Sequence, residues 1–177
     1  NLYGDLGNII TLKKRCEWRG ISVEIEDIGI GDTIKEHDLY FIGGGQDKQQ
    51  QDVADELFKN KEFLTTERDN GAVFLGICGG YQLFGHYYQP FDGDKLKGIS
   101  LLDAYTVAGH KRFIGNVTVE TNFLTPSTLV GFENHSGLTY IQGDTQPLGK
   151  VIVGNGNNGN DKTAGARFKN VFGTYLH

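Results

Sequence analysis

The spacing of apolar residues in the first half of the chain predicts helices that alternate with strands. Residues 8–20 carry apolar side chains at helical spacing, with Asn8 as a capping residue and Gly20 as a stop signal. Residues 21–25 alternate apolar with polar positions, which is typical of a strand. This order predicts a helix followed by a strand.

Two further apolar runs have the composition of strands in a parallel sheet. Residues 39–42 end in three consecutive glycines, and residues 72–77 are apolar almost throughout. Between them, residues 53–58 place apolar side chains on one face of a helix, and a short helix through Leu83 is expected after Cys78. Strands and helices joined by short connections indicate an α/β fold with a mostly parallel open sheet flanked by helices.

The second half of the chain is rich in predicted strands. Glycine and asparagine turns separate them, and residues 154–165 are expected to form a surface loop or a hairpin end. The predicted strands cover residues 117–120, 128–132, 137–141, 151–153 and 166–175. We expect them to complete one domain over residues 1–177, whose two ends look like cuts in a longer protein.

Composition and charge narrow the possible functions. The 177 residues have a formal net charge of -5 and no basic cluster, which argues against nucleic-acid binding. No apolar run is long enough to span a bilayer, and no signal peptide is visible. Two isolated cysteines make neither a disulfide framework nor a zinc site, so we expect a cytoplasmic protein without a bound metal.

The strongest chemical signal is Cys78, which follows a predicted strand. Gly76 and Gly80 flank it in the pattern Gly-x-Cys-x-Gly, the form of a nucleophile elbow. Such a turn directs the backbone N–H of Gly79 toward a forming oxyanion, and the start of the next helix lowers the pKa of the thiol. A cysteine that only fills space needs no such glycines, and Cys16 on the first helix fits that structural role.

A thiolate nucleophile needs a base, and the positions of the histidines rank the candidates. His177 ends an apolar strand, and functional residues in open α/β sheets gather at the carboxyl ends of strands. His135 follows another apolar strand and ranks second. The glycine turn at residues 43–45 also follows a strand, and there Gly44 or Gly45 offers a second N–H for the oxyanion; a tight turn is the structural alternative.

Two segments together resemble the cobyric acid synthase type of class I-like glutamine amidotransferase domain. They are residues 76–85 (GICGGYQLFG) and residues 173–177 (GTYLH). Residues 1–8, 41–47 and 131–135 look closest to one branch of that family, the amidotransferase subunit of lipid II isoglutaminyl synthase. The resemblance implies a flavodoxin-like fold.

The resemblance also implies a reaction and a partner. L-Glutamine is expected to be hydrolysed through a thioester on Cys78, with His177 as acid and base. Ammonia is expected to pass to a Mur-ligase-like synthetase subunit of a heterodimer, which amidates the D-glutamate of the lipid-linked acceptor in peptidoglycan synthesis. ATP and Mg²⁺ belong to that partner, and no cofactor is expected in this chain, which has no phosphate-loop motif.

Further residues are candidates for binding glutamine or orienting the histidine. Arg112, expected in the loop before the strand at residues 117–119, is our candidate for the glutamine carboxylate, because a guanidinium matches it bidentately. A solvated loop arginine without that role is the alternative. Gln82 is a second candidate substrate contact, unless it only supports the elbow. Many class I relatives place a glutamate two residues beyond the histidine, but this chain stops at His177. Glu133 and Asp5 are therefore the candidates for that third role.

Three other functions remain open from the sequence. The first is the glutaminase domain of a cobyrinic or cobyric acid amidating synthase, which differs in its acceptor. The second is a cysteine peptidase of flavodoxin-like fold, which shares the elbow. The third is a catalytically silent scaffold, although it would need neither Cys78 nor His177.

Overall fold

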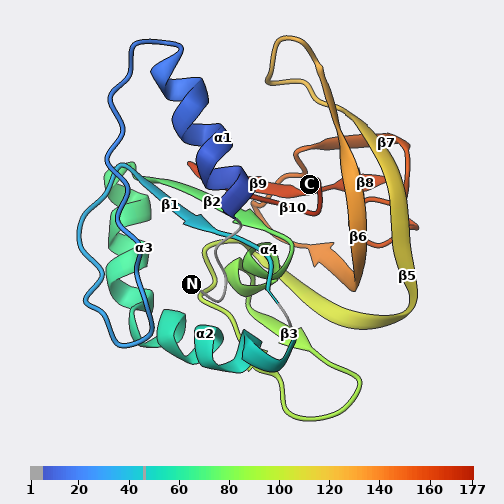
Figure 1. Cartoon of the computed structure of the whole chain (residues 1–177). Helices are drawn as coiled ribbons and strands as arrows, with labels where there is room; N and C mark the ends of the chain where they lie inside the picture. The colour runs from blue at the N-terminus through green and yellow to red at the C-terminus, as the bar shows by residue number, and fades with distance from the viewer. Residues whose placement is uncertain (1–5, 46) are drawn as a thin grey trace.

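The helices of the described residues lie in the first half of the sequence. The computed structural model describes residues 6–45 and 47–177. The helices in these residues are α1 (Leu6–Glu17), α2 (Asp47–Lys59), α3 (Lys61–Asn70) and α4 (Gly79–Phe84). Figure 1 shows α2, α3 and α4 on the same side of the molecule, with α1 above them.

The smaller sheet carries the predicted parallel strands. Its strands are β1 (Leu39–Ile42), β2 (Val73–Ile77), β9 (Ala166–Phe168) and β10 (Val171–Thr174), in the order β1-β2-β10-β9. The strands β1, β2 and β10 are parallel, and β9 runs antiparallel to β10. The carboxyl ends of β1, β2 and β10 therefore meet at one edge, where Gly43, Cys78 and Tyr175 follow them. The predicted α/β architecture is confirmed.

The larger sheet contains the rest of the strands described. They are β3 (Tyr87–Gln89), β4 (Leu96–Lys97), β5 (Ala104–Glu120), β6 (Thr128–Ile141), β7 (Gly149–Val153) and β8 (Thr163–Ala164). Their order is β4-β3-β5-β7-β8, and β6 pairs with β5. Figure 1 shows β5 and β6 curving along the side of the molecule opposite α2 and α3. The long β5–β6 hairpin brings residues distant in sequence next to the end of β10.

The main core joins the smaller sheet to the helices that cover it. The buried rings of Tyr40 on β1 and Phe74 on β2 stack with centroids 4.8 Å apart, and Phe84 of α4 meets Phe74 edge-on at 6.1 Å. Leu64 of α3 is 2% exposed in the same cluster. Burial of this apolar surface stabilises the sheet that carries the predicted nucleophile.

The segment before β1 differs from the prediction. Helix α1 begins at Leu6, so Asn8 lies inside it, and none of its residues is buried. No strand forms over residues 21–25, where Ile21 is 54% and Ile25 is 43% exposed. An alternating pattern makes a strand only where a neighbouring strand supplies hydrogen-bond partners, and residues 21–25 join no ladder among the described residues.

The second half also differs in its boundaries. The strands predicted over residues 128–132 and 137–141 are two parts of β6, because the intervening residues continue the pairing with β5. Residues 154–165 contain the end of the β7–β8 hairpin, as one of the two expectations had it. They are not a surface loop throughout, since Asn157 is fully buried and Asn158 is 3% exposed. Their side chains satisfy backbone carbonyls within the core, as the Asn157 amide does by donating to Gly165 O at 2.9 Å.

Candidate active site

Cys78 has the strained backbone expected of a nucleophile elbow. Its φ is 54° and its ψ is -107°, between the end of β2 and the start of α4. A side chain at Gly80 would collide with the carbonyl oxygen of Ile42, and one at Gly76 would lie 2.8 Å from the Phe84 ring. The Cys78 N–H donates to Thr174 O at 2.9 Å. Close packing on both sides therefore holds a conformation that a non-glycine residue rarely adopts.

The glycine turn after β1 lies against this cysteine. A Cβ built on Gly44 would be 3.4 Å from Cys78 Cβ and 3.9 Å from its Sγ. The N–H of Gly80 donates to Gly43 O at 3.1 Å, so the turn and the elbow are tied together. Without a side chain on Gly44, the backbone can approach a substrate bound at the sulfur. The structure thus brings the two predicted oxyanion segments side by side.

His177 is tied to β6 rather than to the end of β10. Strand β10 ends at Thr174, and the backbone of His177 pairs with Phe132: its N–H donates to Phe132 O at 2.9 Å, and its carbonyl accepts at 3.1 Å. Thr174 pairs with Ile77 next to Cys78. The three-residue step from Thr174 therefore connects the elbow to His177.

His135, the second candidate base, is buried. It is 3% exposed, and its ring stacks on Tyr175 with centroids 3.6 Å apart. Its Nδ1 donates to Gly137 O at 2.9 Å, while its Nε2 meets no hydrogen-bond partner among the described residues. Burial lowers the pKa of His135, although the hydrogen bond to Gly137 and the nearby Glu133 oppose this, so the site favours the neutral ring.

Glu133 and Asp5 were the candidates for orienting His177. The carboxylate of Glu133 is buried and accepts from Asn155 N at 2.8 Å, from Asn155 Nδ2 at 2.6 Å and from Gly156 N at 2.9 Å. It lies 3.9 Å from His135 Nε2, beyond hydrogen-bond distance. Glu133 therefore anchors the residue 154–162 loop. Asp5 lies outside the described residues.

Arg112 lies within a strand and not in the predicted loop. It belongs to β5 at the point where the register with β6 shifts, between Ala108 and Phe113. Its side chain is exposed, and its Nε donates to Asn134 Oδ1 at 2.7 Å. The irregular pairing turns this exposed guanidinium toward the part of β6 that carries His135, whose pKa it influences.

Gln82 is buried behind the elbow. Its Oε1 accepts from Gln50 Nε2 at 3.0 Å, and its Nε2 donates to the Tyr175 hydroxyl at 3.3 Å. Sequence reasoning did not identify Gln50 or Tyr175 as part of the site. The apolar pattern around Tyr175 indicates only a buried strand, and nothing in the spacing of Gln50 reveals its long-range partner.

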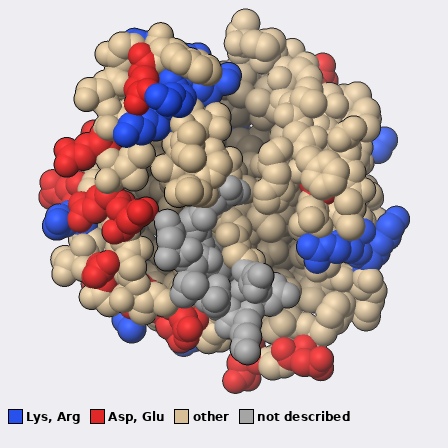
Figure 2. All heavy atoms as spheres, in the orientation of Figure 1, with Lys and Arg blue, Asp and Glu red and all other residues tan. Residues whose placement is uncertain are grey.

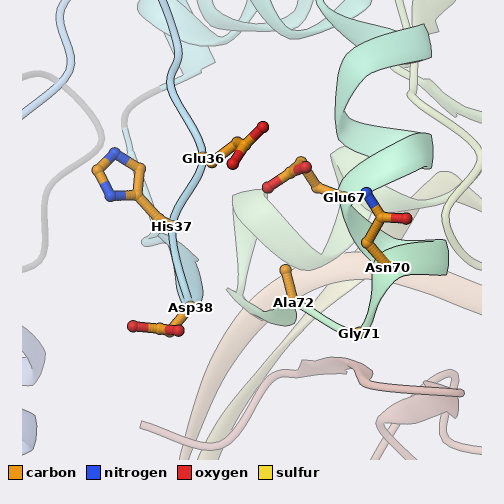
Figure 3. Close-up of a pocket in the computed structure, with 7 residues that line it drawn as sticks. All are labelled: Glu36, His37, Asp38, Glu67, Asn70, Gly71 and Ala72. Carbon is orange, nitrogen blue, oxygen red and sulfur yellow. The ribbon is translucent and has the colours of Figure 1, made fainter.

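A surface cavity of about 430 Å³ lies elsewhere on the molecule, lined by residues 36–38, 67 and 70–72. Figure 3 shows Glu36, before β1, and Glu67, on α3, pointing toward one another across it. Asp38 and Ala72 precede β1 and β2, so this cavity is at the amino ends of the strands. Its acidic lining disfavours the carboxylate of an amino acid, and it lies at the opposite edge from Cys78.

Surface charge, possible metal ligands and helix length are further features of the residues that the structure describes. Figure 2 shows one face, on which Lys and Arg form small groups between acidic and uncharged side chains. Within residues 6–45 and 47–177, no three His, Cys, Asp or Glu side chains form a metal-binding group. None of the helices in the described part of the chain is long and apolar enough to cross a membrane.

Comparisons with known proteins agree with this geometry. The chain is 45% identical over 179 residues to the lipid II isoglutaminyl synthase (glutamine-hydrolyzing) subunit GatD of Staphylococcus aureus (strain N315), with 100% of this chain and 72% of that protein covered. Identity to the GatD subunit of Streptococcus pneumoniae (strain ATCC BAA-255 / R6) is 41% over 180 residues, covering 100% of this chain and 69% of that protein.

A solved structure and a family model complete the comparison. A glutamine amidotransferase crystal structure has the same fold, with a TM-score of 0.66 at 12% identity over 99% of this chain and 86% of that one. The model of the CobB/CobQ-like glutamine amidotransferase domain matches residues 1–177. This chain therefore belongs to the CobB/CobQ-like glutamine amidotransferase family, as the elbow and the Gly-Thr-Tyr-Leu-His segment predicted.

Proposed function

We propose that this chain hydrolyses L-glutamine with Cys78 as nucleophile and His177 as base, and that it supplies ammonia to a synthetase subunit. The single observation that carries the proposal is the Cys78 elbow, held in a left-handed conformation and packed against the Gly44 turn. Such strain persists where a sharp turn must present a nucleophile. A cysteine that only fills space gains nothing from it.

The chemistry follows from the residues at the carboxyl ends of the strands. The Cys78 thiolate attacks the side-chain amide carbon of glutamine, and N–H groups of Gly79 and of Gly44 or Gly45 stabilise the oxyanion. His177 protonates the departing nitrogen, and the C–N bond breaks. Ammonia is released, and a glutamyl thioester remains on Cys78. His177 then takes a proton from water, which attacks the thioester; the C–S bond breaks and glutamate is released.

Arg112 binds the α-carboxylate of glutamine in this proposal. Its guanidinium is exposed, and the hydrogen bond from Nε to Asn134 orients the plane of the group beside β6. A planar guanidinium binds a carboxylate through two parallel hydrogen bonds, which a lysine ammonium cannot do. Gln82 is less suited to the substrate-binding role first considered for it, because Gln50 and Tyr175 occupy both ends of its amide.

The acceptor and the partner follow from the similarity to GatD. Both reported relatives are subunits of lipid II isoglutaminyl synthase. We propose that a Mur-ligase-like subunit binds ATP and Mg²⁺, activates the D-glutamate carboxyl of lipid II and receives the ammonia in a cytoplasmic heterodimer. This chain then needs no cofactor of its own. Docking of the partner closes the site and excludes water, which raises the glutaminase rate.

The test is glutamate release from glutamine by the full-length protein, with and without its synthetase subunit. We expect a low rate for the protein alone, a higher rate in the complex, and loss of both in Cys78→Ala. The matched control is Cys16→Ala, which removes the other thiol in helix α1 and leaves the rate unchanged. Glutamate release that persists in Cys78→Ala, or no release even with the partner, would favour the silent scaffold.

A further inference from the structure

A continuous chain of buried polar side chains lies behind the elbow. Gln50 Nε2 donates to Gln82 Oε1 at 3.0 Å, and Gln82 Nε2 donates to the Tyr175 hydroxyl at 3.3 Å. The Tyr175 hydroxyl lies 2.7 Å from that of Thr139, which lies 2.8 Å from that of Thr106. Tyr175 accepts from Gln82, and either hydroxyl can be the donor between Tyr175 and Thr139. We call these five residues the buried polar chain.

Three members of the buried polar chain come from the three segments that make up the site. Gln50 is on α2, which follows the glycine turn; Gln82 is on α4, one helical turn after Cys78; and Tyr175 is two residues before His177. Figure 1 shows α4 lying between α2 and the sheet that contains β10. We infer that Gln50, Gln82 and Tyr175 are positioning residues that hold the oxyanion turn, the nucleophile and the base in register for the proposed glutaminase reaction, on which this inference rests.

Burial makes this connection specific. All five residues are nearly inaccessible: Gln50 and Tyr175 are 2% exposed, Gln82 is 8%, and Thr106 and Thr139 are 1%. Hydrogen bonds in such a low-dielectric interior are directional, and a buried donor or acceptor that loses its partner finds no water to replace it. A displacement of any one segment therefore breaks a bond that the site cannot easily restore.

The tyrosine at the centre is held in one orientation. The His135 ring lies parallel to it, at an interplanar angle of 2° and a centroid distance of 3.6 Å. Burial raises the pKa of Tyr175, so the hydroxyl keeps its proton at neutral pH. Gly137 leaves room for the junction, since a Cβ there would collide with the Gln82 amide and lie 3.0 Å from the Tyr175 oxygen.

The test uses Tyr175→Phe, which removes one hydroxyl and keeps the ring. The matched control is Tyr81→Phe. Tyr81 is also buried on α4 and touches Tyr175 edge-on, but its hydroxyl donates to Asn157 at 3.2 Å, in the residue 154–162 loop. Each variant thus loses one buried phenol hydroxyl, which in Tyr175 bonds to Gln82 and Thr139 and in Tyr81 bonds to Asn157. Only the first loses a bond between segments that carry the proposed catalytic groups.

The full-length protein is assayed in complex with its synthetase subunit. We expect Tyr175→Phe to lower kcat for glutamine hydrolysis about tenfold with KM changed less than about twofold, because a slight misplacement of reacting groups affects the transition state more than binding. Tyr81→Phe keeps its kcat, although its melting temperature also falls through the loss of its own buried hydrogen bond. In Gln50→Leu, kcat falls as well, and the double variant Gln50→Leu/Tyr175→Phe is no worse than the poorer single variant.

A second measurement separates this inference from the proposed function. The pH profile of Cys78 alkylation by iodoacetamide, read by peptide mass spectrometry, requires no turnover. We expect the profile to move to higher pH in Tyr175→Phe and to stay in place in Tyr81→Phe, because only the first loosens His177 relative to the thiol. If the wild-type protein has no glutaminase activity, the proposed function is refuted. The alkylation profile would still test whether the buried polar chain positions His177 relative to Cys78. Equal kcat and equal profiles in the two phenylalanine variants would overturn the inference.

Discussion

The conformation of Cys78 predicts an unusual order of stability among variants at this position. Replacing a residue by glycine ordinarily costs stability relative to alanine, because glycine has more freedom in the unfolded chain. At Cys78, φ is 54° and ψ is -107°, a conformation that alanine adopts only under strain and glycine adopts easily. We therefore expect Cys78→Gly to be more stable than Cys78→Ala.

The magnitude follows from two opposing contributions. A non-glycine residue in such a region carries strain of about 1–3 kcal/mol. The extra entropy of glycine in the unfolded chain offsets about 0.5–1 kcal/mol of that gain. The net advantage of Cys78→Gly over Cys78→Ala is then about 1 kcal/mol, which corresponds to roughly 2–4 °C in melting temperature for a domain of this size. Both variants lack the sulfur, so its lost contacts cancel in the comparison.

The assay is urea unfolding of the two variants, followed by circular dichroism. The matched control compares Cys16→Gly with Cys16→Ala, because Cys16 lies in the regular helix α1, where glycine should gain nothing over alanine. If Cys78→Gly is less stable than Cys78→Ala by the ordinary glycine cost, the elbow stores no strain. The backbone conformation of Cys78 would then no longer indicate a nucleophile elbow.

Three further predictions concern the surroundings of Cys78. In Gly44→Ala the new methyl group lies 3.4 Å from Cys78 Cβ, an ordinary contact, so we expect an unchanged melting temperature. We expect kcat for glutamate release to fall about 100-fold, because the methyl group interferes with the oxyanion position. Arg112→Gln should raise KM for glutamine by about 10-fold or more, because charge-assisted hydrogen bonds to the carboxylate are lost. Lys111→Gln makes the same charge change one residue away and should leave KM unchanged. Equal KM values in the two variants would argue against the carboxylate role of Arg112. The pKa of His135 in the folded protein is lowered below its ordinary value of 6.5. Neutral His135 therefore contributes stability at pH values above 6.5, and this stability is lost as the pH falls through the folded-state pKa. Urea unfolding at pH 7 and pH 5 should therefore show a smaller acid loss in His135→Gln than in wild type, and an identical loss would contradict the prediction.

Local sequence was sufficient for the elbow and for the strands beside it. Gly76 and Gly80 leave space for the Phe84 ring and for the carbonyl of Ile42, and only residues without a side chain fit there. The apolar run before Cys78 forms the central strand β2, as its composition predicts. The glycines and the apolar run are contiguous in the sequence, so a sequence pattern records them, even though Gly80 makes its contact with the distant Ile42.

The sequence patterns failed where long-range pairing decides the outcome. Residues 21–25 have the alternation of a strand and form none, because no described strand lies beside them. Arg112 was expected in a loop, but the register of β5 against β6 places it at an irregular point within a strand. His135 ranked second among the candidate bases, and no sequence pattern showed that the same pairing buries it against Tyr175.

The amino-acid sequence by itself indicated the proposed nucleophile, the glycine turn beside it and the family, because each corresponds to short, contiguous motifs. Only the tertiary structure decided which polar groups meet behind that motif. Gln50 and Gln82 lie on different helices and are 32 residues apart in the sequence, and Tyr175 follows Gln82 by a further 93 residues. The physical reason is that a hydrogen bond depends on the position of both partners to within tenths of an ångström, and here the packing of the two sheets sets those positions.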